Sequence, residues 1–227
     1  MKIEHIFFDL DHTLWNFEKN SSLTFQQIFS DHQLDVNFET FLPTYIPINL
    51  KYWKLYREEE VSKEDLRYYR LKETFDSINY SISDQLIDKL SEDYIEKLPN
   101  HNHLFDGTIE LLEYLKPKYQ LHIITNGFEE VQNLKMEKSG IIHFFDKIIT
   151  SESVGVKKPN PLVFHHALEK TKASPKSSMM IGDNLEADIE GALNCGFSAI
   201  HCDFEKVSNT PKNINSVHYL LEIKQYL

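Results

Sequence analysis

The chain carries five short apolar runs, spaced along the sequence with room for helices between them. They occupy residues 3–9, 120–125, 147–150, 178–182 and 198–202. Short runs that are apolar throughout fit strands buried on both faces of a parallel sheet. Their alternation with helical segments predicts an α/β fold built on a doubly wound parallel sheet. A weaker strand signal follows at residues 217–220.

Residues from about 17 to 98 interrupt this alternation, because apolar and aromatic residues recur there at helical spacing. The pattern predicts helices over 18–32, 38–57, 63–76 and 83–97. Ser62 and Ser83 are candidate N-caps of the last two. We therefore expect a core domain of residues 1–16 and 100–227, with a helical domain of residues 17–99 inserted after the first strand. Because both ends of this insertion return to the sheet near the end of the first strand, we expect the helical domain to act as a lid over that end.

Composition restricts the class of partner. The chain has 227 residues, is 41% hydrophobic and has a formal net charge of −11. It can bury a substantial core, and its charge gives no electrostatic footprint for polymeric nucleic acid or an anionic membrane surface. Neither a signal peptide nor an apolar run long enough to span a membrane is evident. We expect a cytoplasmic protein, a monomer or a homodimer, that acts on a small molecule.

Two carboxylates stand where the first apolar run ends, at Asp9 and Asp11. In an extended chain, side chains two residues apart point the same way, so these two are expected to converge. Such a pair is unfavourable unless a cation or a shared proton compensates it. A turn in which Asp11 caps the next segment is the alternative, and the pair alone does not exclude it.

Polar motifs also follow the next three runs. They are Thr125-Asn126-Gly127, then Lys158, and then Gly182-Asp183-Asn184 with Asp188. Ligands of open α/β sheets bind beyond the carboxyl ends of the strands, so we expect these residues to meet at one crevice.

In this order the motifs resemble those of the haloacid dehalogenase-like (HAD) hydrolase superfamily: Asp-x-Asp-x-Thr, a Ser or Thr, a Lys, and Gly-Asp with a further Asp. The corresponding residues are Asp9, Asp11, Thr13, Thr125, Lys158, Asp183 and Asp188. The resemblance covers the whole chain and implies a Rossmann-like core with a helical C1 cap.

The chemistry of these residue types suits hydrolysis of a phosphomonoester. Asp9 is the candidate nucleophile, which would form an aspartyl-phosphate. Mg²⁺, or Mn²⁺ in its place, would be held by Asp9, the backbone carbonyl of Asp11, and Asp183. Asp11 would then act as general acid and general base.

The remaining motif residues are candidates for holding phosphate. Thr125 offers a hydroxyl, and the backbone N–H groups of Asn126 and Gly127 can donate at the start of the next helix. Lys158 supplies a positive charge. Asp188 and Asn184 are expected behind these groups, where Asp188 would hold Lys158 or a metal-bound water, or would only favour its helix N-terminus.

The opening Phe-Asp-Leu-Asp-His-Thr-Leu-Trp, with His12 and Trp15, is similar to that of the YjjG-type pyrimidine 5′-nucleotidases. The later Thr125-Asn126-Gly127-Phe128, followed by Gln132 and Lys135, fits the same group. The resemblance implies a nucleoside monophosphate substrate, including noncanonical pyrimidine ones, with the base near His12, Trp15 and Phe17. Trp15 is equally a core candidate, and Arg70 is either a substrate partner or a solvated helix charge.

Other functions remain open on the same core. They are a sugar-phosphate or phosphoglycolate-type phosphatase, a phosphomutase, and a catalytically idle phosphate-binding relative. The idle relative is disfavoured, because Asp9, Asp11, Lys158 and Asp183 are all present.

Overall fold

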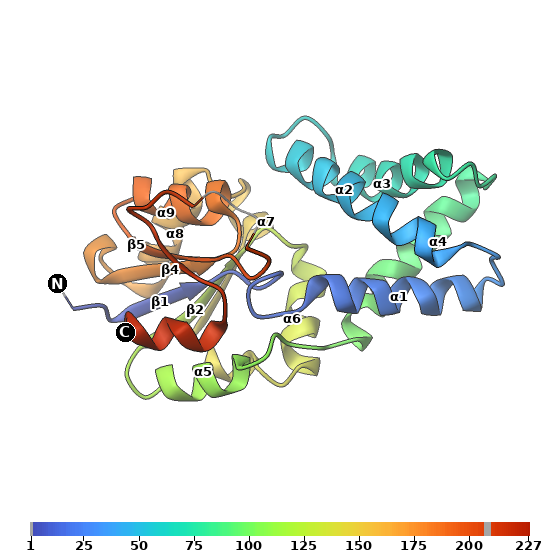
Figure 1. The fold of residues 1–227 in the computed structure, drawn as a ribbon. Coiled ribbons are helices and arrows are strands. Elements are labelled where there is room, and N and C mark those ends of the chain that lie inside the picture. The colour runs from blue at the N-terminus through green and yellow to red at the C-terminus, as the bar shows by residue number, and fades with distance from the viewer. Residues whose placement is uncertain (1, 207–209) are drawn as a thin grey trace. The chain divides into compact units, whose positions relative to one another are not determined.

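A parallel sheet of six strands forms the centre of the larger of two units in the computed structural model, which describes residues 2–206 and 210–227 (Figure 1). The strands are β1 (His5–Phe8), β2 (Gln120–Thr125), β3 (Lys147–Thr150), β4 (Ser178–Gly182), β5 (Ser198–Cys202) and β6 (Asn215–Val217). Their order is β3-β2-β1-β4-β5-β6, and every neighbouring pair is parallel. The predicted doubly wound α/β fold is confirmed.

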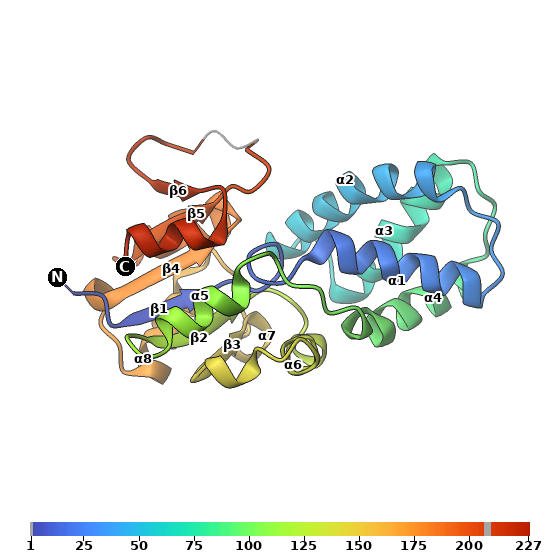
Figure 2. The ribbon, with the colours of Figure 1, turned by 60° about the horizontal axis from the view of Figure 1, so that its bottom comes forward.

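Helices cover both faces of this sheet (Figures 1 and 2). The helices α5 (Thr108–Leu115) and, at the C-terminus, the 3₁₀ helix Leu220–Gln225 lie on one face, and α8 (Pro161–Thr171) and α9 (Gly191–Asn194) lie on the other. The unit also contains α6 (Glu129–Lys138), α7 (Ser151–Val154), the helical turn Leu185–Glu190, and short 3₁₀ turns at Ile142–Phe144 and Pro175–Ser177. Burial of both sheet faces explains why the strands read as continuous apolar runs.

The register of the central strands sets the position of the polar motifs. Phe8, the last residue of β1, pairs with Ile123 of β2 and Ile181 of β4. The residues that follow each strand are therefore brought to the same edge of the sheet. Phe7 of β1 packs in a buried apolar cluster that includes Ile124 of β2 and Phe164 of α8.

The smaller unit, Glu18–His101, is helical. Its main helices are α1 (Phe17–Asp31), α2 (Phe38–Arg57), α3 (Lys63–Ser77) and α4 (Asp84–Lys97), followed by a 3₁₀ turn at Leu98–Asn100. The Ser62 and Ser83 side chains accept hydrogen bonds from the backbone N–H groups of Asp65 and Leu86, as expected of N-caps. The four predicted helices are confirmed to within one residue at every end.

The C-terminal tail differs from its prediction. The strand signal at residues 217–220 is displaced, because β6 ends at Val217 and a 3₁₀ helix begins at Leu220. The Glu222 carboxylate accepts hydrogen bonds from the backbone N–H groups of His218 and Tyr219 at 2.7 and 3.2 Å. This cap turns the chain into the helix and ends the strand.

Among the described residues, every helix is too short or too polar to cross a lipid bilayer.

Candidate active site

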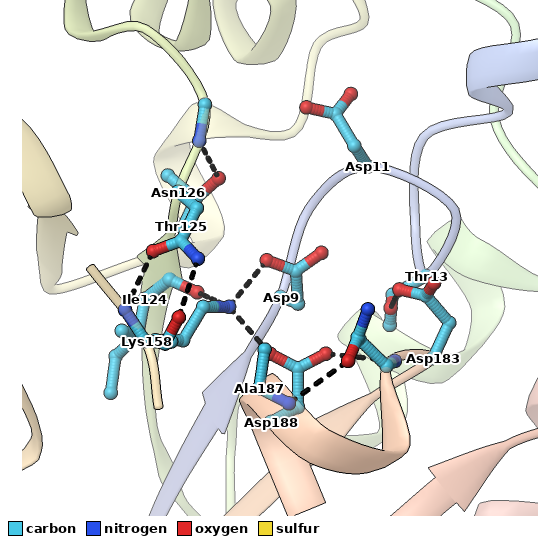
Figure 3. A network of polar contacts seen from close by, with 12 residues as sticks. Asp9, Asp11, Thr13, Ile124, Thr125, Asn126, Lys158, Asp183, Ala187 and Asp188 are labelled. Atoms are coloured by element: carbon cyan, nitrogen blue, oxygen red, sulfur yellow. Dashed lines mark hydrogen bonds and ion pairs between the residues drawn. The ribbon is translucent and has the colours of Figure 1, made fainter. Parts of the chain in front are cut away.

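Asp9 and Lys158 form a buried ion pair at the carboxyl end of β1 (Figure 3). Asp9 directly follows the strand, and its backbone N–H donates to the carbonyl oxygen of Ile181 at 2.9 Å. The Lys158 Nζ atom donates to Asp9 Oδ1 and to the Ile124 carbonyl oxygen, both at 2.7 Å, and lies 2.6 Å from Asp188 Oδ1. One ammonium group thus joins the ends of β1 and β2 to the segment after β4.

Hydrogen bonds with the Asn126 side chain also hold the backbone of Lys158. The Asn126 side chain accepts from the Lys158 backbone N–H at 2.8 Å and donates to the Lys158 carbonyl oxygen at 3.0 Å. Asn126 was predicted to contribute its backbone N–H. Its side chain has the further role of fixing Lys158 relative to Thr125.

Three carboxylates meet beside the lysine. The carboxylate oxygens of Asp9, Asp183 and Asp188 lie within 4.8 Å of one another. Thr13 donates to Asp183 Oδ1 at 3.0 Å, and the backbone N–H of Asn184 donates to Asp188 Oδ2 at 3.0 Å. Hard oxygen donors at this spacing fit a divalent cation such as Mg²⁺. The expectation from the sequence shares Asp9 and Asp183, but its third ligand was the Asp11 backbone carbonyl, with Asp188 in a supporting place.

Asp188 and Asn184 stabilise the loop that follows β4. A Cβ atom at Gly182 would overlap the Asp188 carboxyl group, so only glycine allows this carboxylate to fold back over the end of β4. The Asn184 side chain accepts from the Ala187 backbone N–H at 2.9 Å and caps the helical turn Leu185–Glu190.

Burial and crowding of negative charge govern the pKa values of these groups. Burial raises the pKa of Asp9 well above its usual value, and the Asp188 and Asp183 charges add to this while Lys158 opposes it. Burial, with the charge of Asp188, raises the pKa of Asp183 to about 7. Burial lowers the pKa of Lys158, but Asp188 and Asp9 outweigh it and hold that pKa above its usual value. A cation bound here would favour the ionised carboxylates.

Thr125, Asn126 and Gly127 lie beside this cluster, at the end of β2. The Thr125 side chain is buried, and its Oγ1 accepts a hydrogen bond from the Gly127 backbone N–H at 3.1 Å. The three predicted phosphate-binding residues therefore stand on the same edge of the sheet as Asp9 and Lys158.

The Asp11 side chain does not converge with that of Asp9, contrary to the expectation from an extended chain. β1 ends at Phe8, and the backbone N–H groups of Leu14 and Trp15 both donate to the Leu10 carbonyl oxygen, so the chain turns. Figure 3 shows the Asp11 carboxylate directed away from Asp9. The spacing rule for strands does not apply once the strand has ended.

Two residues of α6 hold Asp11 instead. Lys135 Nζ donates to both oxygens of the Asp11 carboxylate, at 2.7 and 2.9 Å, and Gln132 Nε2 donates to Asp11 Oδ2 at 3.0 Å. Both α6 side chains are buried. The sequence showed Gln132 and Lys135 only as part of a family pattern. Their spacing of three residues, on one side of the helix after Thr125, was the available signal for a joint contact.

The predicted base-binding residues are largely buried. The Trp15 and Phe17 rings lie 6.3 Å apart and the His12 and Phe17 rings 4.8 Å apart, measured between centroids. Lys135 Nζ lies 4.4 Å from the Trp15 ring centroid. Trp15 is fully buried, which favours the core interpretation for this residue, while His12 is half-buried.

Arg70 lies in the interior of the helical unit. Its side chain is buried, donates to Asn49 Oδ1 at 3.1 Å and stands 4.8 Å from the centroid of the Tyr94 ring. The alternative of a solvated helix charge is wrong for this residue. Contact with substrate stays a prediction, and the packing of Arg70 in the cap interior does not favour it.

His201 is a further buried residue that the sequence did not single out. From β5, its Nε2 lies 2.8 Å from the Asp183 carbonyl oxygen, and its Nδ1 lies 2.7 Å from Thr210 Oγ1. Because a carbonyl oxygen only accepts, Nε2 carries the proton. His201 thereby supports the backbone of the carboxylate cluster from the neighbouring strand.

The geometry and sequence comparisons agree on the family. The haloacid dehalogenase-like hydrolase family matches residues 6–202. This chain belongs to the haloacid dehalogenase-like hydrolases.

Similar proteins extend over most of the chain. Pyrimidine 5′-nucleotidase YjjG of Escherichia coli is 32% identical over 199 residues, covering 87% of this chain and 85% of YjjG. Pyrimidine 5′-nucleotidase PynA of Streptococcus pneumoniae is 27% identical over 202 residues, covering 88% of this chain and 84% of PynA. The magnesium-bound crystal structure of the HAD-hydrolase YfnB from Bacillus subtilis matches the fold with a TM-score of 0.90, at 24% identity and covering 100% and 99% of the two chains.

Proposed function

We propose that this chain is a Mg²⁺-dependent phosphomonoesterase that acts on pyrimidine nucleoside 5′-monophosphates through an aspartyl-phosphate on Asp9. The observation that carries the proposal is the Lys158 ammonium group, which is held between Asp9 and Asp188 beside Asp183. A buried cation among three carboxylates suits a dianionic phosphate that must be brought up to a carboxylate nucleophile.

In the first half-reaction, an oxygen of the Asp9 carboxylate attacks phosphorus and the bond from phosphorus to the ester oxygen breaks. Asp11 donates a proton to the departing oxygen, which leaves as a nucleoside hydroxyl group. Lys158 and the Thr125 hydroxyl stand at the edge of the sheet where the phosphoryl oxygens would lie, and they would stabilise the charge on those oxygens; the Gly127 N–H, predicted as a further donor, instead donates to Thr125 Oγ1.

In the second half-reaction, the Asp11 carboxylate takes a proton from water while the water oxygen attacks phosphorus. The bond between phosphorus and the Asp9 oxygen breaks, which releases inorganic phosphate and restores the carboxylate. Mg²⁺, or Mn²⁺ in its place, would be held by Asp9, Asp183 and the Asp11 backbone carbonyl, with Asp188 nearby, and would supply positive charge that reduces repulsion between phosphate and carboxylate.

The nucleotide part of the proposal rests on the two relatives named pyrimidine 5′-nucleotidases, which match over most of their length. His12 is the half-buried member of the group predicted to lie near the base. A cytoplasmic location and a monomeric or homodimeric state remain predictions from the sequence.

The test is phosphate release from UMP, CMP, noncanonical pyrimidine monophosphates, AMP and ribose 5-phosphate, each with Mg²⁺, with Mn²⁺ and with EDTA. We expect release with either metal, a preference for pyrimidine nucleotides, and loss of activity with EDTA. Asp9→Asn should abolish turnover, because an amide cannot form the acyl-phosphate at a useful rate. Asp106→Asn, an exposed position in the same unit, is the matched control and should behave like the wild type.

Activity that survives Asp9→Asn, or that needs no divalent cation, contradicts the mechanism. Preference for ribose 5-phosphate over every nucleotide would point to a sugar-phosphate phosphatase and leave the mechanism in place. Phosphate transfer to another position of the same substrate, without net release, would point to a phosphomutase.

A further inference from the structure

Gln132 connects two groups with different tasks in the proposed reaction. It lies on α6 with a fully buried side chain. Its Nε2 atom donates to Thr125 Oγ1 at 2.7 Å and to Asp11 Oδ2 at 3.0 Å. One amide nitrogen therefore joins a phosphate-binding candidate to the candidate proton donor.

The orientation of the amide follows from its partners. The Asp11 carboxyl group is paired with the Lys135 ammonium group at 2.7 Å, and in this ionised form it can only accept hydrogen bonds. The amide must then present its NH₂ group, not its oxygen, to Asp11. The same NH₂ group faces Thr125, so Thr125 Oγ1 is an acceptor in this contact.

Thr125 Oγ1 receives a second hydrogen bond from the Gly127 backbone N–H at 3.1 Å. A hydroxyl oxygen has two lone pairs and one proton. With both lone pairs engaged by Gly127 and Gln132, the proton of Thr125 must point to a third group. A phosphate oxygen at the edge of the sheet, beside Asp9, would be such a group.

The absence of a side chain at Gly127 leaves room for the Gln132 amide group beside Thr125. A Cβ atom there would overlap the amide group of Gln132. Gly127 does not lie in the left-handed region of backbone conformation, so its φ angle does not call for glycine. Glycine is needed because Gln132 packs directly against the backbone at this position.

We propose that Gln132 is a positioning residue that holds the Thr125 hydroxyl as a hydrogen-bond donor toward the phosphoryl group and fixes the Asp11 carboxylate in the same contact. The assignment rests on the proposed phosphatase function. Gln132 itself touches neither phosphate nor nucleophile. Its contribution is greatest when charge builds up on the phosphoryl oxygens, because a preset donor needs no reorganisation at that moment.

The test compares Gln132→Met, which keeps the length of the side chain but cannot hydrogen bond, with Gln132→Glu, which places a second carboxylate against Asp11. The control is Asn133→Asp, the corresponding amide-to-acid change on the exposed side of α6. With UMP as substrate, we expect kcat to fall about tenfold or more in Gln132→Met, and further in Gln132→Glu. KM should change by less than about threefold, as for an interaction that strengthens in the transition state.

A double-mutant cycle with Thr125→Val tests whether Gln132 affects kcat through the Thr125 hydroxyl. If Gln132 acts through the Thr125 hydroxyl, Gln132→Met should lower kcat much less in the Thr125→Val background than in the wild type. Equal fold-losses in both backgrounds overturn this route. A lower unfolding midpoint with unchanged kcat would assign Gln132 a packing role only and overturn the proposal.

Binding of inorganic phosphate separates the two proposals, because it requires no turnover. Calorimetry with Mg²⁺ and inorganic phosphate should show binding that is weaker by about twofold for Gln132→Met than for the wild type, in line with the small change expected in KM. If the wild type releases no phosphate from any ester but binds phosphate with this difference, the phosphatase function fails and the role of Gln132 stands. A wild-type chain that neither turns over nor binds phosphate overturns both.

Discussion

At the scale of single residues, Lys158 is the side chain on which the others depend. It is 2% exposed and has carboxylate oxygens within 2.7 Å on two sides. Removing one partner from a buried group of charges is more harmful than removing the whole group, because the remaining charges are left unpaired. The lysine therefore contributes to stability as well as to chemistry.

We predict that Lys158→Met lowers kcat/KM by at least about 100-fold and, without metal, lowers the free energy of unfolding by about 3–5 kcal/mol at neutral pH. Asp9 and Asp188 would remain buried without their cation. Urea denaturation followed by circular dichroism measures the second effect. Lys157→Met, at the adjacent position outside the cluster, is the control and should change both quantities little. A Lys158→Met chain that is inactive but as stable as the wild type would contradict the predicted loss of free energy of unfolding.

Asp11 shows why the candidate site was only partly predictable from the sequence. The motif residues at the strand ends were identifiable, because each follows an apolar run and parallel strands end at a common edge. The partners of Asp11 were not, since Lys135 and Gln132 reach it from a helix more than 120 residues away in sequence. No local pattern specifies which helix packs over a loop.

At the scale of elements, β1 and β2 are joined by a pair of buried histidines, His5 at the start of β1 and His122 within β2. His5 Nδ1 and His122 Nε2 lie 3.1 Å apart, and the rings are stacked with centroids 5.4 Å apart. Burial lowers the pKa of both side chains, and the positive charge that His5 would carry contributes to lowering the pKa of His122 to about 4, from 6.5. The pair is therefore neutral in the folded protein at neutral pH.

This pair predicts a dependence of stability on pH. Below pH 6.5 the unfolded chain takes up a proton at His122, whereas the folded chain resists until pH is near 4. The contribution of His122 to the free energy of unfolding is thus fully present above pH 6.5 and declines as pH falls toward 4, by up to about 1.4 kcal/mol per pH unit. His122→Leu should reduce this slope in urea denaturation measured across the range. His143→Leu, at an exposed position, should leave it unchanged, and an unaltered slope in His122→Leu would contradict the prediction.

The elements themselves follow the sequence closely where burial is complete. The five apolar runs became β1 to β5, because strands covered on both faces need apolar residues at every position. The strand predicted at residues 217–220 is displaced, since β6 is only three residues long and Glu222 determines where the chain turns. A short edge strand has too few buried positions to leave a clear pattern.

At the scale of the whole molecule, the helical unit is inserted into the sheet unit at a point where the two connecting segments pair. The Asn16 backbone N–H donates to the His103 carbonyl oxygen at 3.0 Å, and Trp15 forms an antiparallel bridge with Leu104. The chain leaves and returns at adjacent positions. The sheet unit therefore does not need the insertion to bring its two segments together.

We predict that a chain lacking residues 18–101, with Phe17 and Asn102 joined by a short Gly-Ser linker, still folds cooperatively. It should bind Mg²⁺ and inorganic phosphate, because Asp9, Lys158 and Asp183 belong to the retained unit. Its preference for pyrimidine nucleotides over p-nitrophenyl phosphate should be lost if the insertion provides base selectivity. Thermal unfolding by calorimetry and phosphate titration measure the first two outcomes. A retained part without a cooperative transition would contradict the independence of the sheet unit.

The central position of β1 also has a consequence for how the protein is made. Residues 5–8 leave the ribosome before their neighbours in the sheet, which begin at Gln120 on one side and at Ser178 on the other. β1 can therefore pair with β2 once Gln120–Thr125 has been synthesised, but it lacks its second neighbour until Ser178–Gly182 follows. A nascent chain that stops before β4 can form the helical insertion but cannot bring Asp9 to Asp183. The catalytic centre is thus completed late in translation, and truncated products will lack it.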